Sequence, residues 1–409
     1  DRRERTRQFH ALPDLAPEDY PEKHMNVKIL VVDDEPDLEP LILQRFRRQI
    51  RAGEMQFVFA RDGQEAIAKL ESDPEIEVVL SDINMPVMDG LTLLARLNDM
   101  PRLIKTVMVS AYTDMINLRM AMNRGAYDFV TKPIDFQDLE ATVRKTYREL
   151  EMLREAKRTK EELEEIRAEL AVAAKIQQSL LPEPQVTRDD VDVAAVMLPA
   201  RDVSGDFYDF FPIDHHQFGF VIGDVSGKGI PAALFMAVAR TVLRSTALHG
   251  ATPSECLAAV NRILVPQSNG QTYVTLFYGI LDTSSGKLTW TIGGHSAPWL
   301  LPATGEPRQL KGERGFMVGM FDDATFDTNE AMLQSGDTIL LHTDGITEAE
   351  NQDHELFGKA RLSELIRSIH EHTVLGVAER VMETIRAYTS GAPQADDITL
   401  LAVRFGKTA

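Results

Sequence analysis

The first third of the chain alternates between short apolar runs and segments with helical spacing of apolar residues. We predict strands at the runs 27–32, 56–60, 76–82, 106–111 and 127–133. Helices are predicted between them, at 37–50, 63–72, 90–97 and 115–125. Strands that are apolar throughout and separated by helices are typical of a parallel sheet covered on both faces. We therefore expect a five-stranded, doubly wound α/β domain at 26–135, preceded by a flexible polar leader at 1–25.

The pattern changes over residues 136–181, which are rich in Glu, Lys, Arg, Ala and Leu, all good helix formers. Two interleaved seven-residue registers run along this segment: Ala156, Leu163, Leu170 and Gln177, and Met152, Thr159, Ile166, Ala173 and Leu180. Such a seam predicts a long helical linker that pairs with a second copy as a coiled coil, giving a homodimer. The alternative is a single solvated helix packed on a neighbouring domain.

The last part of the chain, 182–409, alternates apolar and polar positions in its strands. In "KLTWTIGG", Leu288, Trp290 and Ile292 share one face of the predicted strand. Two helical stretches, 231–250 and 254–267, lie between such strands. Strands, then two helices, then strands predict an α+β domain of packed sheets with helices outside. The chain is thus expected to be multidomain.

Net charge, cysteine content and the length of apolar runs limit the kinds of partner and location that the chain can have. The 409 residues carry a net charge of −19, which disfavours nucleic acid or an anionic membrane as the main partner. Cys256 is the only cysteine, so an intrachain disulfide is impossible, and we expect a cytoplasmic location. No apolar run approaches the roughly 18–20 residues that span a bilayer.

Polar side chains follow the predicted parallel strands. Asp33 and Asp34 follow the first strand, Asp82 the third, Ser110 the fourth and Lys132 the fifth. The carboxyl ends of parallel strands meet at one edge of the sheet, so these groups converge. Carboxylates gathered there repel one another unless a cation joins them, and Mg²⁺ prefers such oxygen ligands. A carboxylate beside Mg²⁺ and a lysine can attack a phosphoryl group, and Asp82 is the candidate nucleophile.

The motifs "VVDDE", "SDINMPVMDG", "VSAYTD" and "FVTKP" resemble the response-regulator receiver family. The resemblance implies that a sensor histidine kinase phosphorylates Asp82. It implies that Ser110 and Phe129 form the switch pair and that Lys132 binds a phosphoryl oxygen. It also implies one Mg²⁺ held by Asp33, Asp34, Asp82 and the main-chain carbonyl of Asn84.

A second set of acids flanks strands of the last domain. Asp224 ends an apolar run, Asp344 follows another, and Asp396 and Asp397 precede a third, while Asp206 and Asp209 stand in "SGDFYD". Glycines beside several of them permit turns in which a carbonyl also faces a cation. Two divalent ions bridged by a carboxylate can lower the pKa of a water and neutralise a phosphoryl group.

These motifs, with "GDVSGKGIPAALFMA" and "GGHSAPWLL", resemble the metal-dependent (PPM, type 2C) protein phosphatases in their SpoIIE-like bacterial branch. The resemblance implies a sandwich of two antiparallel sheets flanked by helices, and activity toward phosphoserine or phosphothreonine proteins. Two Mn²⁺ or Mg²⁺ ions would then be held by Asp206, Asp224, the carbonyl of Val225, Asp344 and Asp396. Asp224 would bridge both ions, and Asp397 would support the site from outside.

Several roles stay open. Arg201 is a candidate for binding the substrate phosphate, although a surface arginine is often only solvated. His295 has the position of a structural histidine more than a catalytic one, and the general acid is unassigned.

In this branch the usual substrate is a phosphorylated anti-sigma-factor antagonist of the STAS type, used in partner switching. The alternative is a non-catalytic adaptor that sequesters a sigma factor or another regulator.

Overall fold

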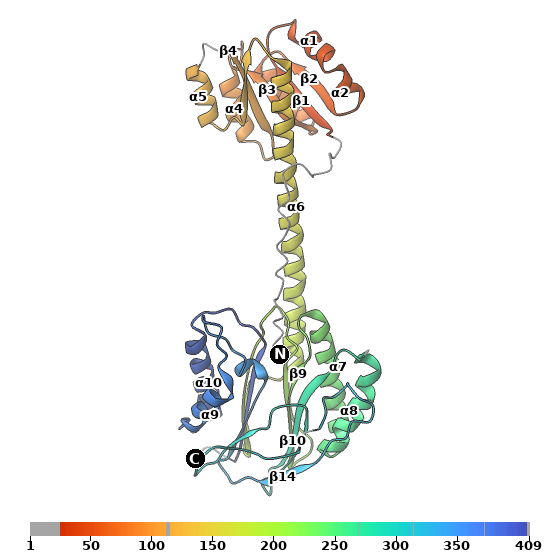
Figure 1. Cartoon of the computed structure of the whole chain (residues 1–409), viewed down its shortest axis with the longest axis vertical. Coiled ribbons are helices and arrows are strands. Elements are labelled where there is room, and N and C mark those ends of the chain that lie inside the picture. The colour runs from red at the N-terminus through yellow and green to blue at the C-terminus, as the bar shows by residue number, and fades with distance from the viewer. Residues whose placement is uncertain (1–24, 112–114, 269, 314, 372, 407–409) are drawn as a thin grey trace, which may run out of the picture. The chain divides into compact units, whose positions relative to one another are not determined.

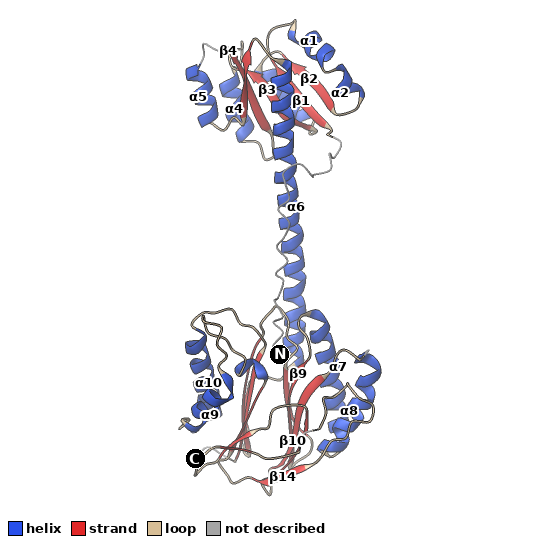
Figure 2. Cartoon of the chain, in the orientation of Figure 1, coloured by secondary structure: helices blue, strands red, loops and turns tan. Residues whose placement is uncertain are grey.

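The computed structural model describes residues 25–111, 115–268, 270–313, 315–371 and 373–406. Residues 1–24, most of the expected leader, lie outside the described residues. The chain divides into two compact units, Asp1–Leu163 and Glu164–Ala409, and each is described separately. Figure 1 colours the chain from the N-terminus to the C-terminus, and Figure 2 distinguishes helices from strands.

The first unit is built on a five-stranded parallel sheet with the order β2-β1-β3-β4-β5. Its strands are β1 (Val27–Val32), β2 (Met55–Ala60), β3 (Ile76–Asp82), β4 (Lys105–Ala111) and β5 (Asp128–Lys132). The helices are α1 (Leu38–Arg45), α2 (Arg47–Arg51), α3 (Gly63–Ser72), α4 (Gly90–Asn98) and α5 (Met115–Asn123). The doubly wound α/β prediction is confirmed, and each predicted strand agrees with an observed one within two residues.

Separate hydrophobic clusters cover the two faces of this sheet. Ile42 and Phe46 pack with Leu139 and Val143 on one face, while α3 and α4 supply Leu70 and Leu93 to the other. The helix expected at 37–50 is instead two helices, which meet at Phe46. The backbone of Phe46 leaves helical geometry (φ −92°, ψ 15°) while its ring is buried against Phe57. The break thus coincides with the burial of an aromatic ring.

The long helix α6 (Phe136–Leu180) has 45 residues and carries residues of both units. Leu139, Val143 and Leu150 belong to the core of the first unit. Residues 151–169 are mostly exposed, in keeping with their many charges. None of the described helices combines the length and apolar character that crossing a bilayer requires.

The second unit is a sandwich of two antiparallel sheets with a pair of helices on each outer face (Figures 1 and 2). One sheet has the order β14-β11-β10-β9-β8, from Asn329–Met332, Lys287–Gly293, Val274–Asp282, Gln217–Val225 and Phe207–Pro212. The other has the order β13-β12-β15-β16-β7-β6, from Arg308–Gln309, Trp299–Leu301, Thr338–His342, Ile398–Phe405, Val191–Leu198 and Gln185–Thr187.

The core of this unit lies between the sheets. Phe220, Phe277 and Trp290 of one sheet are buried together with Leu341 and Leu401 of the other. Helices α7 (Ile230–Ala247) and α8 (Pro253–Ser268) cover the first sheet. The second is covered by α9 (Gly358–Arg367) and α10 (Val374–Thr389). A short 3₁₀ helix, η1 (Asp344–Ile346), follows β15. This arrangement confirms the predicted sandwich with flanking helices.

Candidate functional site

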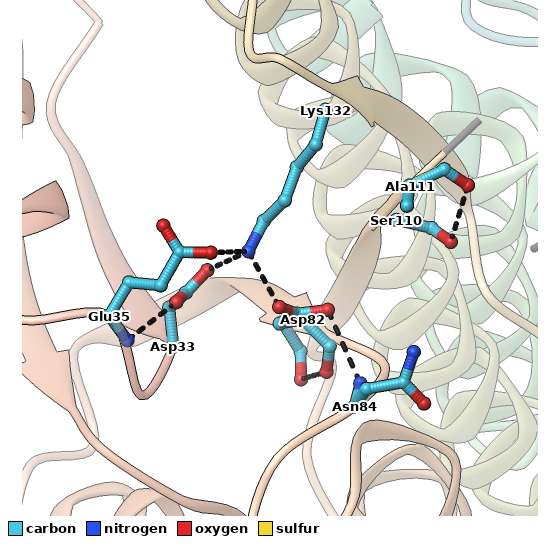
Figure 3. A network of polar contacts seen from close by, with 8 residues as sticks. Asp33, Glu35, Asp82, Asn84, Ser110, Ala111 and Lys132 are labelled. Carbon is cyan, nitrogen blue, oxygen red and sulfur yellow. Dashed lines mark hydrogen bonds and ion pairs between the residues drawn. The ribbon is translucent and has the colours of Figure 1, made fainter. Parts of the chain in front are cut away.

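The carboxyl edge of the parallel sheet gathers the charged residues that the sequence placed there. The Lys132 Nζ lies 2.6 Å from Asp82 Oδ2 and 3.0 Å from Asp33 Oδ2 (Figure 3). It also lies 2.9 Å from Glu35 Oε1. Since β1, β3 and β5 end at the same edge, residues 33, 82 and 132 meet although the chain separates them widely.

This cluster offers oxygen ligands for a cation. Carboxylate oxygens of Asp33, Glu35 and Asp82 lie within 4.8 Å of one another. Asp34 and Glu35 are both exposed, and Glu35 rather than Asp34 belongs to that group in the metal-free structure. The backbone N–H of Asn84 donates to Asp82 Oδ1 at 3.3 Å, which places Asn84 beside the site. Hard carboxylate oxygens fit Mg²⁺.

Charge and burial oppose each other in this cluster. Burial disfavours the ammonium of Lys132, but hydrogen bonds to Asp82, Glu35 and Asp33 dominate and raise its pKa. Burial raises the pKa of Asp33, while its hydrogen bonds with the Glu35 backbone and Lys132 act in the opposite direction. Lys132 therefore stays protonated and partly neutralises the three acids.

Ser110 and Phe129, the expected switch pair, differ in exposure. Ser110 is buried, and its Oγ donates to the Ala111 carbonyl at 3.3 Å (Figure 3). Phe129, on β5, is exposed. The two residues stand on adjacent strands, two positions apart in register, because Ser110 pairs with Thr131 and Met108 with Phe129.

The second unit brings acids from four separate segments to one edge of its sandwich. Asp206 precedes β8, Asp224 lies at the end of β9, Asp344 begins η1 and Asp396 stands just before β16. The Thr343 Oγ1 donates to Asp206 Oδ2 at 2.7 Å, so the segment after β15 contacts the segment before β8. A Cβ on Gly345 would lie 1.9 Å from the Asp397 carbonyl oxygen, so only glycine lets these two backbones approach so closely.

These acids perturb one another. Burial, together with Asp344 and Asp396, raises the pKa of Asp224 from 3.8 to about 7. Burial and the neighbouring Asp224 raise the pKa of Asp206, and burial and Asp396 raise that of Asp344. The pKa of Glu348 is also raised, by burial and then by Asp344 and Asp396. Mutual repulsion of this kind is relieved when a cation joins the cluster.

A lysine supplies one positive charge at this edge. Lys228 Nζ lies 3.0 Å from Asp396 Oδ2 and also donates to the Ala395 carbonyl. Its ammonium neutralises one acid, whereas the pKa values of Asp206, Asp224 and Asp344 are all raised. An all-oxygen donor set with excess negative charge fits hard divalent ions such as Mg²⁺ or Mn²⁺.

Two further acids of the motifs, Asp397 and Asp209, form hydrogen bonds and ion pairs with other residues of the same chain. Asp397 accepts from the backbone N–H groups of Ala200 and Gly205, each at 2.7 Å, and from Ser204 Oγ at 2.9 Å. The buried Asp209 pairs with Arg240 at 2.9 Å and Arg244 at 2.7 Å, which ties β8 to α7. These contacts make Asp397 a support for the loop before β8 and make Asp209 part of the packing.

Arg201 and His295 lie beside segments that neighbour Asp224. Arg201 is exposed, and its Nη1 is 3.9 Å from where a Cβ of Gly229 would stand, in the loop that follows Asp224. His295 is buried, and its Nδ1 is 2.9 Å from the Oγ1 of Thr275. Thr275 is in turn the cross-strand partner of Asp224.

Three charged residues of the two clusters were not among the predicted site residues. Glu35 directly follows the predicted pair Asp33 and Asp34, so its position next to the strand end was the available signal. Lys228 stands between Gly227 and Gly229, within the motif "GDVSGKGIPAALFMA" that resembles the phosphatase family. Glu348 lies four residues after Asp344, one helical turn away, which was a weaker signal.

Comparison with known families agrees with the two units. Residues 29–144 match the response regulator receiver domain, and residues 214–406 match stage II sporulation protein E (SpoIIE). The first range contains Asp33, Asp82 and Lys132. The second contains Asp224, Asp344 and Asp396 but begins after Asp206.

Individual relatives match somewhat more than half of the chain. The chain is 30% identical over 264 residues to Protein IcfG of Synechocystis sp., covering 58% of this chain and 41% of that one. It is 28% identical over 243 residues to phosphoserine phosphatase RsbU of Bacillus subtilis, covering 59% of this chain and 71% of RsbU. The SiaA-PP2C domain of Pseudomonas aeruginosa shares the fold, with a TM-score of 0.51, 24% identity, and 59% and 98% coverage. The chain thus spans less than half of IcfG.

Proposed function

Because the chain joins a response-regulator receiver domain to a SpoIIE-type PPM phosphatase domain, we propose that it is a two-component response regulator with a phosphatase output. The output is a metal-dependent protein serine/threonine phosphatase. One observation carries this proposal: acids from four separate segments converge, and burial together with Asp344 and Asp396 raises the pKa of Asp224 to about 7. A protein that only binds a partner has no need of such repulsion.

In the phosphatase domain, Asp206, Asp224, Asp344, Asp396 and the Val225 carbonyl are the groups that would hold two Mn²⁺ or Mg²⁺ ions. Such ions, when bound, activate a water and neutralise phosphoryl charge. Asp224 is central because both Asp344 and Asp396 act on it. Thr343 orients Asp206 through its hydrogen bond, and Asp397 holds the loop from which Asp206 projects.

Arg201 is the proposed ligand of the substrate phosphate. Its guanidinium lies beside the loop that follows Asp224 and is exposed, so an entering phosphoprotein can reach it. A guanidinium can bind phosphate oxygens through two parallel hydrogen bonds, which orients the phosphoryl group.

The receiver domain is the proposed input. A histidine kinase transfers a phosphoryl group to Asp82, with Lys132 binding a phosphoryl oxygen and Ser110 and Phe129 acting as the switch pair. One Mg²⁺ would be held by Asp82, the Asn84 carbonyl and Asp33, with Asp34 or Glu35 as a further acid. The convergence of Asp33, Glu35 and Asp82 supports this assignment.

The proposed substrate is a phosphoserine protein of the STAS type that antagonises an anti-sigma factor in partner switching. Support comes from the likeness to RsbU, which is itself named a phosphoserine phosphatase. We further propose a cytoplasmic location.

Dimerisation through α6 is a further part of the proposal. Leu163 and Ile166 are 46% and 54% exposed, and the seam residue Met152 is exposed as well. Gln177, which the heptad register also assigned to the seam, is buried and bonded to Ser204 of its own chain. The dimer contact is therefore proposed for residues 152–166 rather than for the whole seam.

Phosphate release tests the function. A STAS protein phosphorylated on serine is incubated with the full chain, in Mn²⁺ and again in EDTA, and free phosphate is measured. Release that requires Mn²⁺ and is reversibly stopped by EDTA is expected. Tight binding of STAS or sigma-factor partners without any release, in every metal condition, would favour the adaptor function and refute the enzyme.

A further inference from the structure

The loop that joins β7 to β8 carries two proposed site residues, Arg201 and Asp206. Asp397 holds this loop from one direction, through three hydrogen bonds to Ala200, Ser204 and Gly205. A loop fixed in this way positions the carboxylate that follows it.

A second anchor comes from the end of α6. The side-chain amide of Gln177 donates from Nε2 to the Ser204 carbonyl at 2.8 Å. Its Oε1 accepts from the Ser204 backbone N–H at 2.9 Å. Gln177 is only 7% exposed, so these two bonds satisfy a buried amide and fix the orientation of the Ser204 peptide groups.

Ser204 passes this constraint to the metal-binding edge. Its Oγ donates to Asp397 Oδ2 at 2.9 Å and accepts from the backbone N–H of Asp206 at 3.0 Å. Only one residue separates the peptide held by Gln177 from Asp206. A shift of the helix end is thus transmitted to Asp206 through short, directional contacts.

The same loop packs on another proposed ligand. A Cβ on Gly205 would stand 3.0 Å from the carbonyl oxygen of Val225, and the Val225 N–H donates to the Gly205 carbonyl at 3.4 Å. Displacement of the loop therefore alters the surroundings of Asp206 and of the Val225 carbonyl together.

We propose that Gln177 is a positioning residue, through which the last turn of α6 sets the affinity of the phosphatase domain for its metal ions. This inference rests on the proposed function and adds a regulatory contact to it. The helix also supplies Leu139, Val143 and Leu150 to the receiver core, so a change that displaces α6 reaches the metal loop through Gln177. The neighbouring Gln178 is exposed and provides a matched control.

The test measures Mn²⁺ binding to the full chain without substrate, by electron paramagnetic resonance of free Mn²⁺. Sites of the phosphatase domain are defined as those lost in Asp224→Asn. Gln177→Met has nearly the same size but cannot make either bond, and we expect about 10-fold or greater weakening at these sites, as for other supporting residues of metal sites. Gln178→Met should bind as the wild type does. Equal affinities of the two variants would overturn the proposal.

Ser204→Ala gives a second, independent variant because it removes the Oγ link to Asp206 and Asp397. If Gln177 acts through Ser204, the double variant weakens Mn²⁺ binding by less than the product of the two single effects. An effect equal to that product would show that the residues act separately and would contradict the proposal. Circular dichroism of each variant verifies that it is folded.

Failure of the inference can be distinguished from failure of the proposed function. If the wild type binds Mn²⁺ at Asp224-dependent sites and releases phosphate while Gln177→Met matches it, only the role of Gln177 is wrong. A wild type without such sites would overturn both.

Discussion

Replacing Asp224 by asparagine should stabilise the metal-free protein and at the same time abolish its activity. The carboxyl group of Asp224 is largely buried, and both burial and the neighbouring Asp344 and Asp396 disfavour its charge. Asparagine keeps the size of the side chain and removes the charge. Since most substitutions of buried polar groups destabilise, a gain in stability here would be a specific sign of electrostatic repulsion.

The magnitude follows from the pKa. Raising the pKa of Asp224 from 3.8 to about 7 corresponds to at most about 4 kcal/mol, at 1.36 kcal/mol per pKa unit. Between about pH 4 and pH 7 the folded protein binds this proton more tightly than the unfolded chain does. The stability of the metal-free wild type therefore falls as pH rises through this window, and the full cost is present above pH 7. For a domain of this size, about 4 kcal/mol corresponds to at most about 8–16 °C in Tm.

Scanning calorimetry in EDTA at pH 5 and pH 8 measures this effect for the wild type and Asp224→Asn. Asp322→Asn, which alters an exposed acid, is the control for the loss of one charge. We expect the variant to melt above the wild type at pH 8, with a smaller difference at pH 5. Adding Mn²⁺ should raise the Tm of the wild type much more than that of the variant, because a ligand stabilises only the state that binds it.

One result would refute this reasoning. If Asp224→Asn in EDTA melts below both the wild type and Asp322→Asn at pH 8, Asp224 makes net favourable contacts in the metal-free fold. Burial and repulsion from Asp344 and Asp396 would then not make the Asp224 carboxylate a net cost to the metal-free fold.

Four further outcomes are expected. Asp82→Asn should lose any change in phosphatase rate that beryllofluoride produces, and a retained response would place the phosphoacceptor elsewhere. Arg201→Ala should raise the KM for a phosphoprotein by about 10- to 100-fold, since a hydrogen bond to a charged group contributes about 1.5–3 kcal/mol. An unchanged KM would exclude Arg201 from the phosphate site. Val87 is 78% exposed and has φ +64°, a backbone conformation that asparagine tolerates better than valine does. Val87→Asn should therefore raise the unfolding free energy of the receiver by about 1 kcal/mol in denaturant titrations, and a decrease would show that the turn needs valine. Leu163→Glu combined with Ile166→Glu should turn a dimer into a monomer in sedimentation experiments, whereas an intact dimer would place the contact elsewhere.

Much of the architecture followed from periodicity, since strand ends are marked by a change from apolar to charged residues. Asp33, Asp82 and Lys132 could be placed together because all five strands of that sheet run in parallel. In the antiparallel sandwich, convergence of the acids was inferred from the family motifs. The order of strands in a sheet does not follow from the local pattern of residues. For example, β7 pairs with β16, although nearly the whole domain separates them along the chain.

The supporting contacts were beyond the sequence. Asp397 was expected to support the site from outside, but its partners, almost 200 positions away in the chain, could not be inferred from the sequence. Gln177 fits a heptad seam, and its bond to Ser204 depends on how the helix end packs. Glu35, and not Asp34, bonds to Lys132. Which of these adjacent exposed acids faces the lysine depends on side-chain directions, and residue type does not determine those directions.

The central claim is that the acids of the second unit form a centre for two metal ions. A crystal of the protein soaked in Mn²⁺, with anomalous diffraction data collected near the manganese edge, tests it most directly. The account predicts two anomalous peaks among Asp206, Asp224, Asp344 and Asp396, with Asp224 touching both. Density without peaks there, with the four carboxylates apart and Lys228 still paired with Asp396, would contradict it.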